Sequence, residues 1–190
     1  MTSAVHRVEL VAVGVVPPAL LRELMAELRR CLPWPVTQAA SKVDASAAFD
    51  RRRGQYLAPV LIEALLRPSP APGLRRIGVT DLDLFLPVFT HVFGYAPLQG
   101  PVAIASSHRL RPELGGPAHR KQLCGRLVKE ILHELGHTLG LIHCSASWCV
   151  MSPSRSAEEI DLKDASYCEA CAKAIGAVGT TVEVEPCEPP

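Results

Sequence analysis

The chain has 190 residues, a length typical of one domain, and 48% of them are hydrophobic, which excludes wholesale disorder. Lysine and arginine number 20 against 19 acidic residues, so the net charge of +1 predicts no binding to nucleic acid or to an anionic membrane. No secretory signal is visible, and the best apolar stretch, Leu10 to Val16, is too short to span a bilayer. We therefore expect a cytoplasmic protein whose seven cysteines bind metal or stay free, rather than form disulfides.

Strands and helices alternate through the first part of the chain. Val8 to Val16 is rich in β-branched residues and predicts a buried strand. Ala19 to Arg30 carries leucines at helical spacing directly after a pair of prolines, which suit the first turn of a helix. A short strand is predicted at Pro35 to Gln38 and a second helix at Gln55 to Leu66, before a proline-rich surface loop.

Two further strands are predicted, at Arg76 to Thr80 and at Val102 to Ser106, and the aromatic segment Leu82 to Gln99 between them predicts irregular chain. This alternation is typical of an α/β (α+β) protein in which helices cover a twisted mixed sheet. We expect residues 1–190 to form a single domain. Residues 1–140 would be an N-terminal subdomain with the sheet and a long helix, and residues 141–190 a small C-terminal subdomain with cysteines and one or two short helices.

The long helix is predicted from about Ala118 to Leu139, because apolar residues repeat along one face of this segment. That face consists of Leu123, Leu127, Ile131 and Leu135. The opposite side carries polar residues, among them two histidines and two glutamates near the end of the helix.

The run from His133 to His143 has the spacing of a catalytic zinc site. His133 and His137 lie one helical turn apart, so both imidazoles can reach one ion. Gly140 can adopt a positive φ and end the helix in a sharp turn, which returns His143 as a third nitrogen ligand. Three imidazoles and an open position are typical of catalytic zinc, and Glu134 is placed to act as general base toward the zinc-activated water.

The first two histidines alone are weak evidence, since a helix with two solvated histidines is the plain alternative. The complete run is much more specific. The remaining histidines show no such spacing and are expected to be surface or core residues; they are His6, His91, His108 and His119.

Four cysteines with paired spacing follow the third histidine. They are Cys144, Cys149, Cys168 and Cys171. Two close pairs separated by a loop predict a closed, four-thiolate structural zinc site. A disulfide, a redox-active CxxC and inert buried thiols are the alternatives that the spacing leaves open. Of the other cysteines, Cys31 and Cys124 are expected to pack in the core, whereas Cys187 could be a spare thiol or a substitute ligand.

The segment from His133 to Cys171 resembles the archaemetzincins, a family of the metzincin clan of zinc metallopeptidases. The clan pattern HExxHxxGxxH is matched at His133, Glu134, His137, Gly140 and His143. The family's further pattern is matched at Cys144, Cys149, Met151, Cys168 and Cys171, with a gap after Met151 about one residue shorter than in the family.

The resemblance implies a metzincin-like fold in which Met151 is the Met-turn residue, an apolar floor beneath the histidines. It also implies that Val102 to Ser106 is an edge strand above the cleft, able to pair with an extended peptide. Some relatives carry a tyrosine two residues after the methionine, where this chain has Pro153. Tyr167 is a candidate for stabilising the tetrahedral intermediate in its place.

Together these patterns predict a monomeric zinc metallopeptidase that acts on a peptide or protein and holds two zinc ions per chain, one catalytic and one structural. One alternative is a zinc-stabilised module that binds peptides or proteins with little or no proteolysis. The other is a zinc hydrolase for a non-peptide amide or ester, since the chemistry would be the same and only the cleft would differ.

Overall fold

A computed structural model describes residues 7–112 and 116–176. Its main sheet has five strands in the order β2-β1-β5-β9-β8. These are β2 (Val36–Gln38), β1 (Arg7–Ala12), β5 (Leu74–Thr80), β9 (Val102–Ser106) and β8 (Gly94–Tyr95). The first four run parallel and β8 runs antiparallel to β9, so the sheet is mixed, as predicted.

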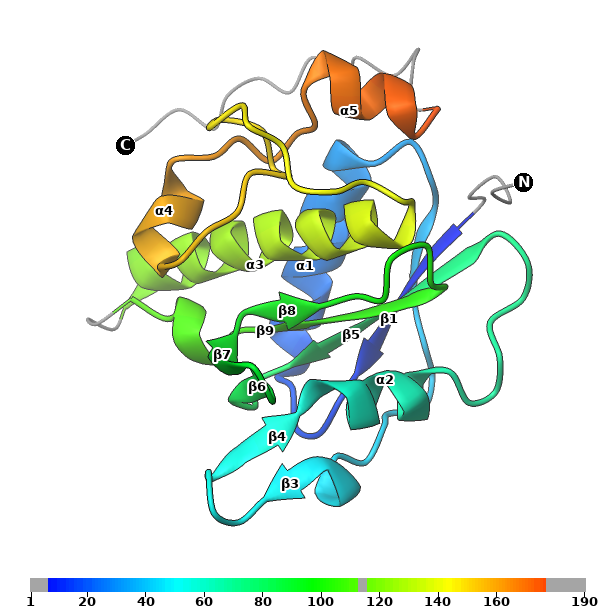
Figure 1. Ribbon diagram of the computed structural model, residues 1–190, viewed down its shortest axis with the longest axis vertical. Coiled ribbons are helices and arrows are strands. Elements are labelled where there is room, and N and C mark those ends of the chain that lie inside the picture. The colour runs from blue at the N-terminus through cyan, green and yellow to red at the C-terminus, as the bar shows by residue number, and fades with distance from the viewer. Residues whose placement is uncertain (1–6, 113–115, 177–190) are drawn as a thin grey trace.

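Helices cover both faces of this sheet (Figure 1). The helices α1 (Pro18–Cys31) and α3 (Pro117–Thr138) lie on one face and α2 (Ala58–Leu65) lies on the other. Successive strand residues point to opposite faces, so Leu10 packs with α1 and α3 while Val11 packs with α2. Two apolar layers therefore hold the sheet, and α3 is fixed by one of them.

A second, smaller sheet lies beside α2 and was not predicted. Its order is β3-β4-β6-β7. The strands are β3 (Phe49–Asp50), β4 (Gln55–Leu57), β6 (Leu84–Leu86) and β7 (Phe89–Val92). Gln55 to Leu57 was wrongly predicted as helix, and Leu82 to Gln99 is not irregular, because it contains β6, β7 and β8. Strands of two to four residues are too short to show a period.

Two predictions about the main sheet also need correction. Strand β1 ends at Ala12 rather than Val16, since Val13 makes only an isolated bridge to Val43 and Gly14 has a φ of +71°. Strand β9 is not an edge strand: it lies between β5 and β8, and β8 forms the edge of the sheet in the described part of the chain. The two residues of β8 were too few to identify from sequence.

The chain beyond α3 packs on the side of that helix that faces away from the sheet (Figure 1). It contains two short helices, α4 (Ala157–Asp161) and α5 (Glu169–Ala174), in keeping with the predicted change to irregular chain. Two 3₁₀ turns occur elsewhere, η1 (Ser46–Ala48) and η2 (His108–Leu110). Within the described residues, none of the helices combines the length and apolar character needed to cross a membrane.

Candidate metal centre and cleft

The end of α3 brings two imidazoles together, with ring centroids 4.7 Å apart and ring planes nearly perpendicular. The ring of His133 contacts the Val150 carbonyl oxygen through Nδ1 at 2.8 Å, and His137 contacts the Leu141 carbonyl in the same way at 2.8 Å. A carbonyl oxygen can only accept, so both Nδ1 atoms carry the proton and both Nε2 atoms are bare in the neutral rings. These Nε2 atoms lie only 3.1 Å apart. Two lone pairs at that distance repel each other unless a cation lies between them.

The turn after α3 supplies the third imidazole. Gly140 has the predicted positive φ, +94°, and the Leu141 amide donates to the Gly136 carbonyl at 3.0 Å, which closes the helix end. The ring centroid of His143 then lies 5.2 Å from those of both other histidines. One nitrogen from each ring lies within 4.8 Å of the others, an arrangement that could hold a metal ion.

Burial favours the neutral form of two of these rings. Burial lowers the pKa of His133 to about 3, and burial also lowers the pKa of His143. Neutral imidazole is the form that binds metal. Tetrahedral zinc with nitrogens at 2.0–2.1 Å places those nitrogens about 3.3 Å apart, close to the separation seen between the first two rings. The histidines therefore fit zinc.

Met151 is fully buried against the turn of α3 that carries His133 and His137. A β-carbon added to Gly136 would lie 2.3 Å from the Met151 sulfur, so the thioether occupies the space that a side chain at residue 136 would need. The structure thus places Met151 beside the helix between the first two histidines.

Two carboxyl groups lie buried beside the histidines. Glu134 and Glu130, one helical turn apart, share a hydrogen bond. Burial raises the pKa of Glu130 to about 7, and burial together with the neighbouring charge raises the pKa of Glu134. Strand β8 approaches both groups closely, since a β-carbon on Gly94 would lie 2.6 Å from Glu134 Cγ and 2.9 Å from Glu130 Oε1.

The four cysteines converge beside this centre. Their sulfur atoms all lie within 4.8 Å of one another, and the Cys144 and Cys168 sulfurs are 3.8 Å apart. A tetrahedral zinc with sulfur at 2.3 Å requires about 3.8 Å between sulfurs, so these thiols also fit zinc. The Cys171 backbone amide lowers the pKa of Cys168 to about 7, which favours the thiolate that binds metal. All four are free thiols, so the disulfide alternative gains no support.

A cleft of about 440 Å³ opens above the histidines. Its floor contains the three histidines with Glu130 and Glu134, one wall is the segment from Leu86 to Ala96, and the other is formed by residues 153–155 and Lys163. His91 lies in the first wall, packed edge-on against Phe93 at 5.7 Å between ring centroids.

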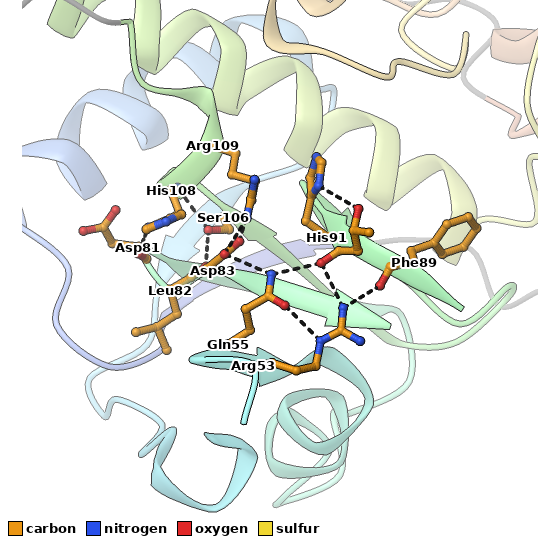
Figure 2. Close-up of polar contacts among 11 residues, drawn as sticks. Arg53, Gln55, Asp81, Leu82, Asp83, Phe89, His91, Ser106, His108 and Arg109 are labelled. Carbon is orange, nitrogen blue, oxygen red and sulfur yellow. Dashed lines mark hydrogen bonds and ion pairs between the residues drawn. The ribbon is translucent and has the colours of Figure 1, made fainter. Parts of the chain in front are cut away.

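A polar network fastens the β7 wall of the cleft (Figure 2). The Arg53 guanidinium donates to the Phe89 and Thr90 carbonyls at 3.0 and 3.1 Å. The Gln55 amide bridges the Thr90 carbonyl and the Asp83 carboxylate, both at 3.0 Å. Arg109, after β9, holds the same carboxylate with two bonds of 2.7 Å. The wall is therefore tied to both sheets.

The structure brings most of the predicted site residues together and leaves one of them away from the cleft. The structure brings together the three histidines, Glu134 and Met151, and it gathers the four cysteines nearby. Tyr167 does not line the cleft: its side chain is half-buried against α3 near Gly136, and its hydroxyl donates to the Leu132 carbonyl at 2.6 Å.

Of the remaining cysteines, Cys124 is buried and Cys31 packs against the core, as expected, while Cys187 lies outside the described residues. Sequence analysis missed Glu130, Lys163 and His91 as cleft residues. His91 was expected at the surface or in the core. For Glu130, the only available signal was its position one turn before Glu134.

The comparisons of this chain with known proteins all indicate the same family. The family model for peptidase family M54 matches residues 27–177. The archaemetzincin of Natronomonas pharaonis is 37% identical over 172 residues, which cover 88% of this chain and 98% of the relative.

Comparison with solved structures indicates the same family. The archaemetzincin of Methanopyrus kandleri has a TM-score of 0.77 and 33% identity, covering 91% of this chain and 94% of its own. A zinc-dependent peptidase from Methanocorpusculum labreanum has a TM-score of 0.76 and 31% identity, covering 88% and 99%. The chain therefore belongs to peptidase family M54, the archaemetzincins, a family of zinc metallopeptidases.

Proposed function

We propose that His133, His137 and His143 hold a catalytic zinc ion and that the chain hydrolyses peptide bonds in the cleft above them. The observation that carries this proposal is the pair of bare Nε2 atoms 3.1 Å apart, with both Nδ1 atoms committed to carbonyls. When bound there, zinc polarises the scissile carbonyl and lowers the pKa of a coordinated water.

Glu134 is the proposed general base. Its buried carboxyl group has a raised pKa, so it can accept a proton from the attacking water and hold it. The same group then returns the proton to the departing amine. Because Glu134 directly follows His133 on α3, its position relative to the imidazoles is set by the helix itself.

The proposed substrate is an extended segment of a peptide or protein. Strand β8 is the edge of the main sheet among the described residues, and the chain from Phe93 to Ala96 lines the cleft. An open strand edge can pair with an extended main chain. This would place a backbone carbonyl of the substrate over the histidines, with little dependence on its side chains.

The four cysteines are proposed to hold a second, structural zinc. A four-thiolate site is closed and leaves no position for water, so it would stabilise the fold and take no part in hydrolysis. Monomeric state and cytoplasmic location stay predictions. Size-exclusion chromatography with light scattering measures the first, and fractionation of the source cells measures the second.

The test of the proposed chemistry is Glu134→Gln. The amide keeps the size of the carboxyl group but cannot accept the proton, so cleavage of a broad peptide mixture, followed by mass spectrometry, should fall by about 100-fold or more while zinc content stays unchanged. Glu23→Gln, at an exposed position on α1, is the control and should leave both unchanged. Retained cleavage by the Glu134 variant would contradict the proposal. Tight peptide binding by the wild type without cleavage would favour the binding-module alternative.

A further inference from the structure

Lys163 is a buried cation in the wall of the cleft that the proposed chemistry does not use. Only 6% of its surface is exposed, and it lies just after α4. Its ammonium group contacts the Val150 carbonyl at 3.5 Å and also donates to the Ser152 carbonyl. These two carbonyls flank Met151, so the cation holds the turn that contains this residue. A buried ammonium group needs compensating acceptors, because moving a charge out of water into the protein interior is unfavourable.

The Val150 carbonyl links Lys163 to the histidines. It is the same oxygen that accepts from His133 Nδ1 at 2.8 Å. That bond fixes the tautomer and the orientation of the ring, and so decides where the bare Nε2 atom points. A carbonyl held by an ammonium group on one side and by an imidazole on the other has little freedom to rotate.

Lys163 also acts electrostatically on the buried carboxyl groups. Its positive charge favours the ionised forms of Glu130 and Glu134, which share a hydrogen bond. Lys163 is thus in contact with the acceptor of one histidine and within electrostatic reach of the general base.

We propose that Lys163 is a positioning residue for the histidine centre: through the Val150 carbonyl it fixes the His133 ring in the orientation that binds zinc. This inference rests on the proposed function of the three histidines as zinc ligands. It does not require that any particular peptide be cleaved.

The test is Lys163→Met, which removes the cation and its donors but keeps an unbranched side chain. Removing such outer partners of a metal ligand lowers metal affinity or activity by about 10–100-fold. We expect a loss of this size in the zinc affinity of the histidine site, measured on the full chain by competition with a chromophoric chelator. With cobalt(II) in that site, the visible absorption bands should shift. Thiolate–metal absorption from the cysteine cluster should stay unchanged.

Lys129→Met is the matched control. Lys129 lies on α3 and also anchors the helix to the chain after it, since its ammonium group donates to the Ile160 and Asp161 carbonyls at 3.1 and 3.2 Å. It does not touch the Met151 turn. Its replacement removes another lysine anchor between α3 and the chain after it, one that is half-buried, so zinc affinity and the cobalt spectrum of the histidine site should remain within about twofold of wild type.

The inference is overturned if Lys163→Met leaves zinc affinity and the cobalt spectrum unchanged, or if Lys129→Met alters them equally. Should Lys163→Met fold poorly by circular dichroism, Lys163→Gln and Lys129→Gln make the same comparison with shorter side chains that retain a donor. In active protein, the Lys163 variant should lose kcat with little change in KM. Because the metal readouts need no substrate, failure to find a cleaved peptide would count against the proposed function and not against this inference.

Discussion

Two glycines set how closely the neighbouring chain approaches the end of α3 that carries the histidines. Gly136 leaves room for the Met151 sulfur, and Gly94 lets strand β8 run directly over Glu134. Neither glycine has a positive φ. Glycine is needed at these positions because a side chain would collide with the neighbouring segment, and not because of the backbone conformation. The spacing of the histidines is visible in the sequence, but the need for these two glycines appears only when the segments are brought together.

Gly94→Ala should therefore lower activity without removing the metal. The added methyl would lie 2.6 Å from Glu134 Cγ and 2.7 Å from its Oε1, so the proposed general base or the edge strand must move. A displacement of about 1 Å can cost as much as 100-fold in rate, and we expect kcat/KM to fall by about 10–100-fold with zinc content intact. Peptide cleavage and metal analysis of the purified variant measure the two quantities.

Gly125→Ala is the matched control for this change. Gly125 lies within α3, and a β-carbon there would meet nothing within 4 Å. Alanine favours helix over glycine by about 1 kcal/mol, so this variant should be at least as stable as the wild type and equally active. Wild-type activity in Gly94→Ala would show that β8 and Glu134 are less tightly packed than the structure indicates.

At the scale of elements, one buried arginine joins α3 to α4. The Arg126 guanidinium is 4% exposed and binds the Asp161 carboxylate through two bonds, of 2.8 and 2.5 Å. A third bond, of 3.0 Å, reaches the Leu110 carbonyl. The side of α3 that carries Arg126 is therefore covered by the chain after the helix.

Asp161→Asn should destabilise the protein in a pH-dependent way. The bond from Arg126 lowers the pKa of Asp161 in the folded state below the unfolded value of about 3.9. The folded state therefore gains stability from this group above that value and loses it as the pH falls below about 4. Because the Asp161 side chain is 36% exposed and partly screened by solvent, we expect the variant to be less stable by about 1 kcal/mol at pH 7, with the difference shrinking toward pH 3, in urea unfolding followed by circular dichroism.

Glu158→Gln tests whether the loss of stability comes from the paired hydrogen bonds between Asp161 and the buried Arg126, rather than from the loss of any nearby negative charge. Glu158 faces the same guanidinium at 3.9 Å, but its side chain is 78% exposed. Its replacement should change stability at pH 7 far less than Asp161→Asn does. Equal losses in the two variants, or an Asp161→Asn loss that persists at pH 3, would contradict the assignment.

Element length decides how well the fold could be predicted. The 22 residues of α3 show several turns of apolar period, and its end is marked by Gly140, so sequence located it within a residue or two. Strand β9 was also located, but its place in the sheet was wrong, because strand order depends on pairing partners. The two residues of β8 carry no period at all, although this strand forms the edge nearest the histidines.

At the scale of the whole molecule, the two candidate metal sites differ in how far they could be predicted. The three histidines lie within one helical turn and the bend that follows, so local spacing alone indicated their convergence. The cleft is assembled from distant segments: His91 comes from the first half of the chain and Lys163 follows α4. Burial of Glu130 and Lys163 also depends on these tertiary contacts, which is why their position at the cleft was not predicted.

The two sites should also differ in what they do for stability. We expect about two zinc per chain in the purified wild type, with one lost in His137→Ala and the other in Cys168→Ser, by mass spectrometric metal analysis. Two of the three histidines extend from α3, which is already packed between the sheet and the C-terminal chain. The cysteines hold a segment whose helices, α4 and α5, have only five and six residues and would not persist alone.

Cys168→Ser should therefore loosen the chain after α3 while His137→Ala leaves it folded. Hydrogen exchange should rise across residues 144–174 in the cysteine variant and should stay near wild type there in the histidine variant. Cys124→Ser, at a buried cysteine outside the cluster, controls for loss of a thiol and should retain both zinc ions. If the histidine variant loosened this segment as much as the cysteine variant, the thiolate site would not be the one that holds it, because zinc stabilises only the part of the chain whose folded form binds it.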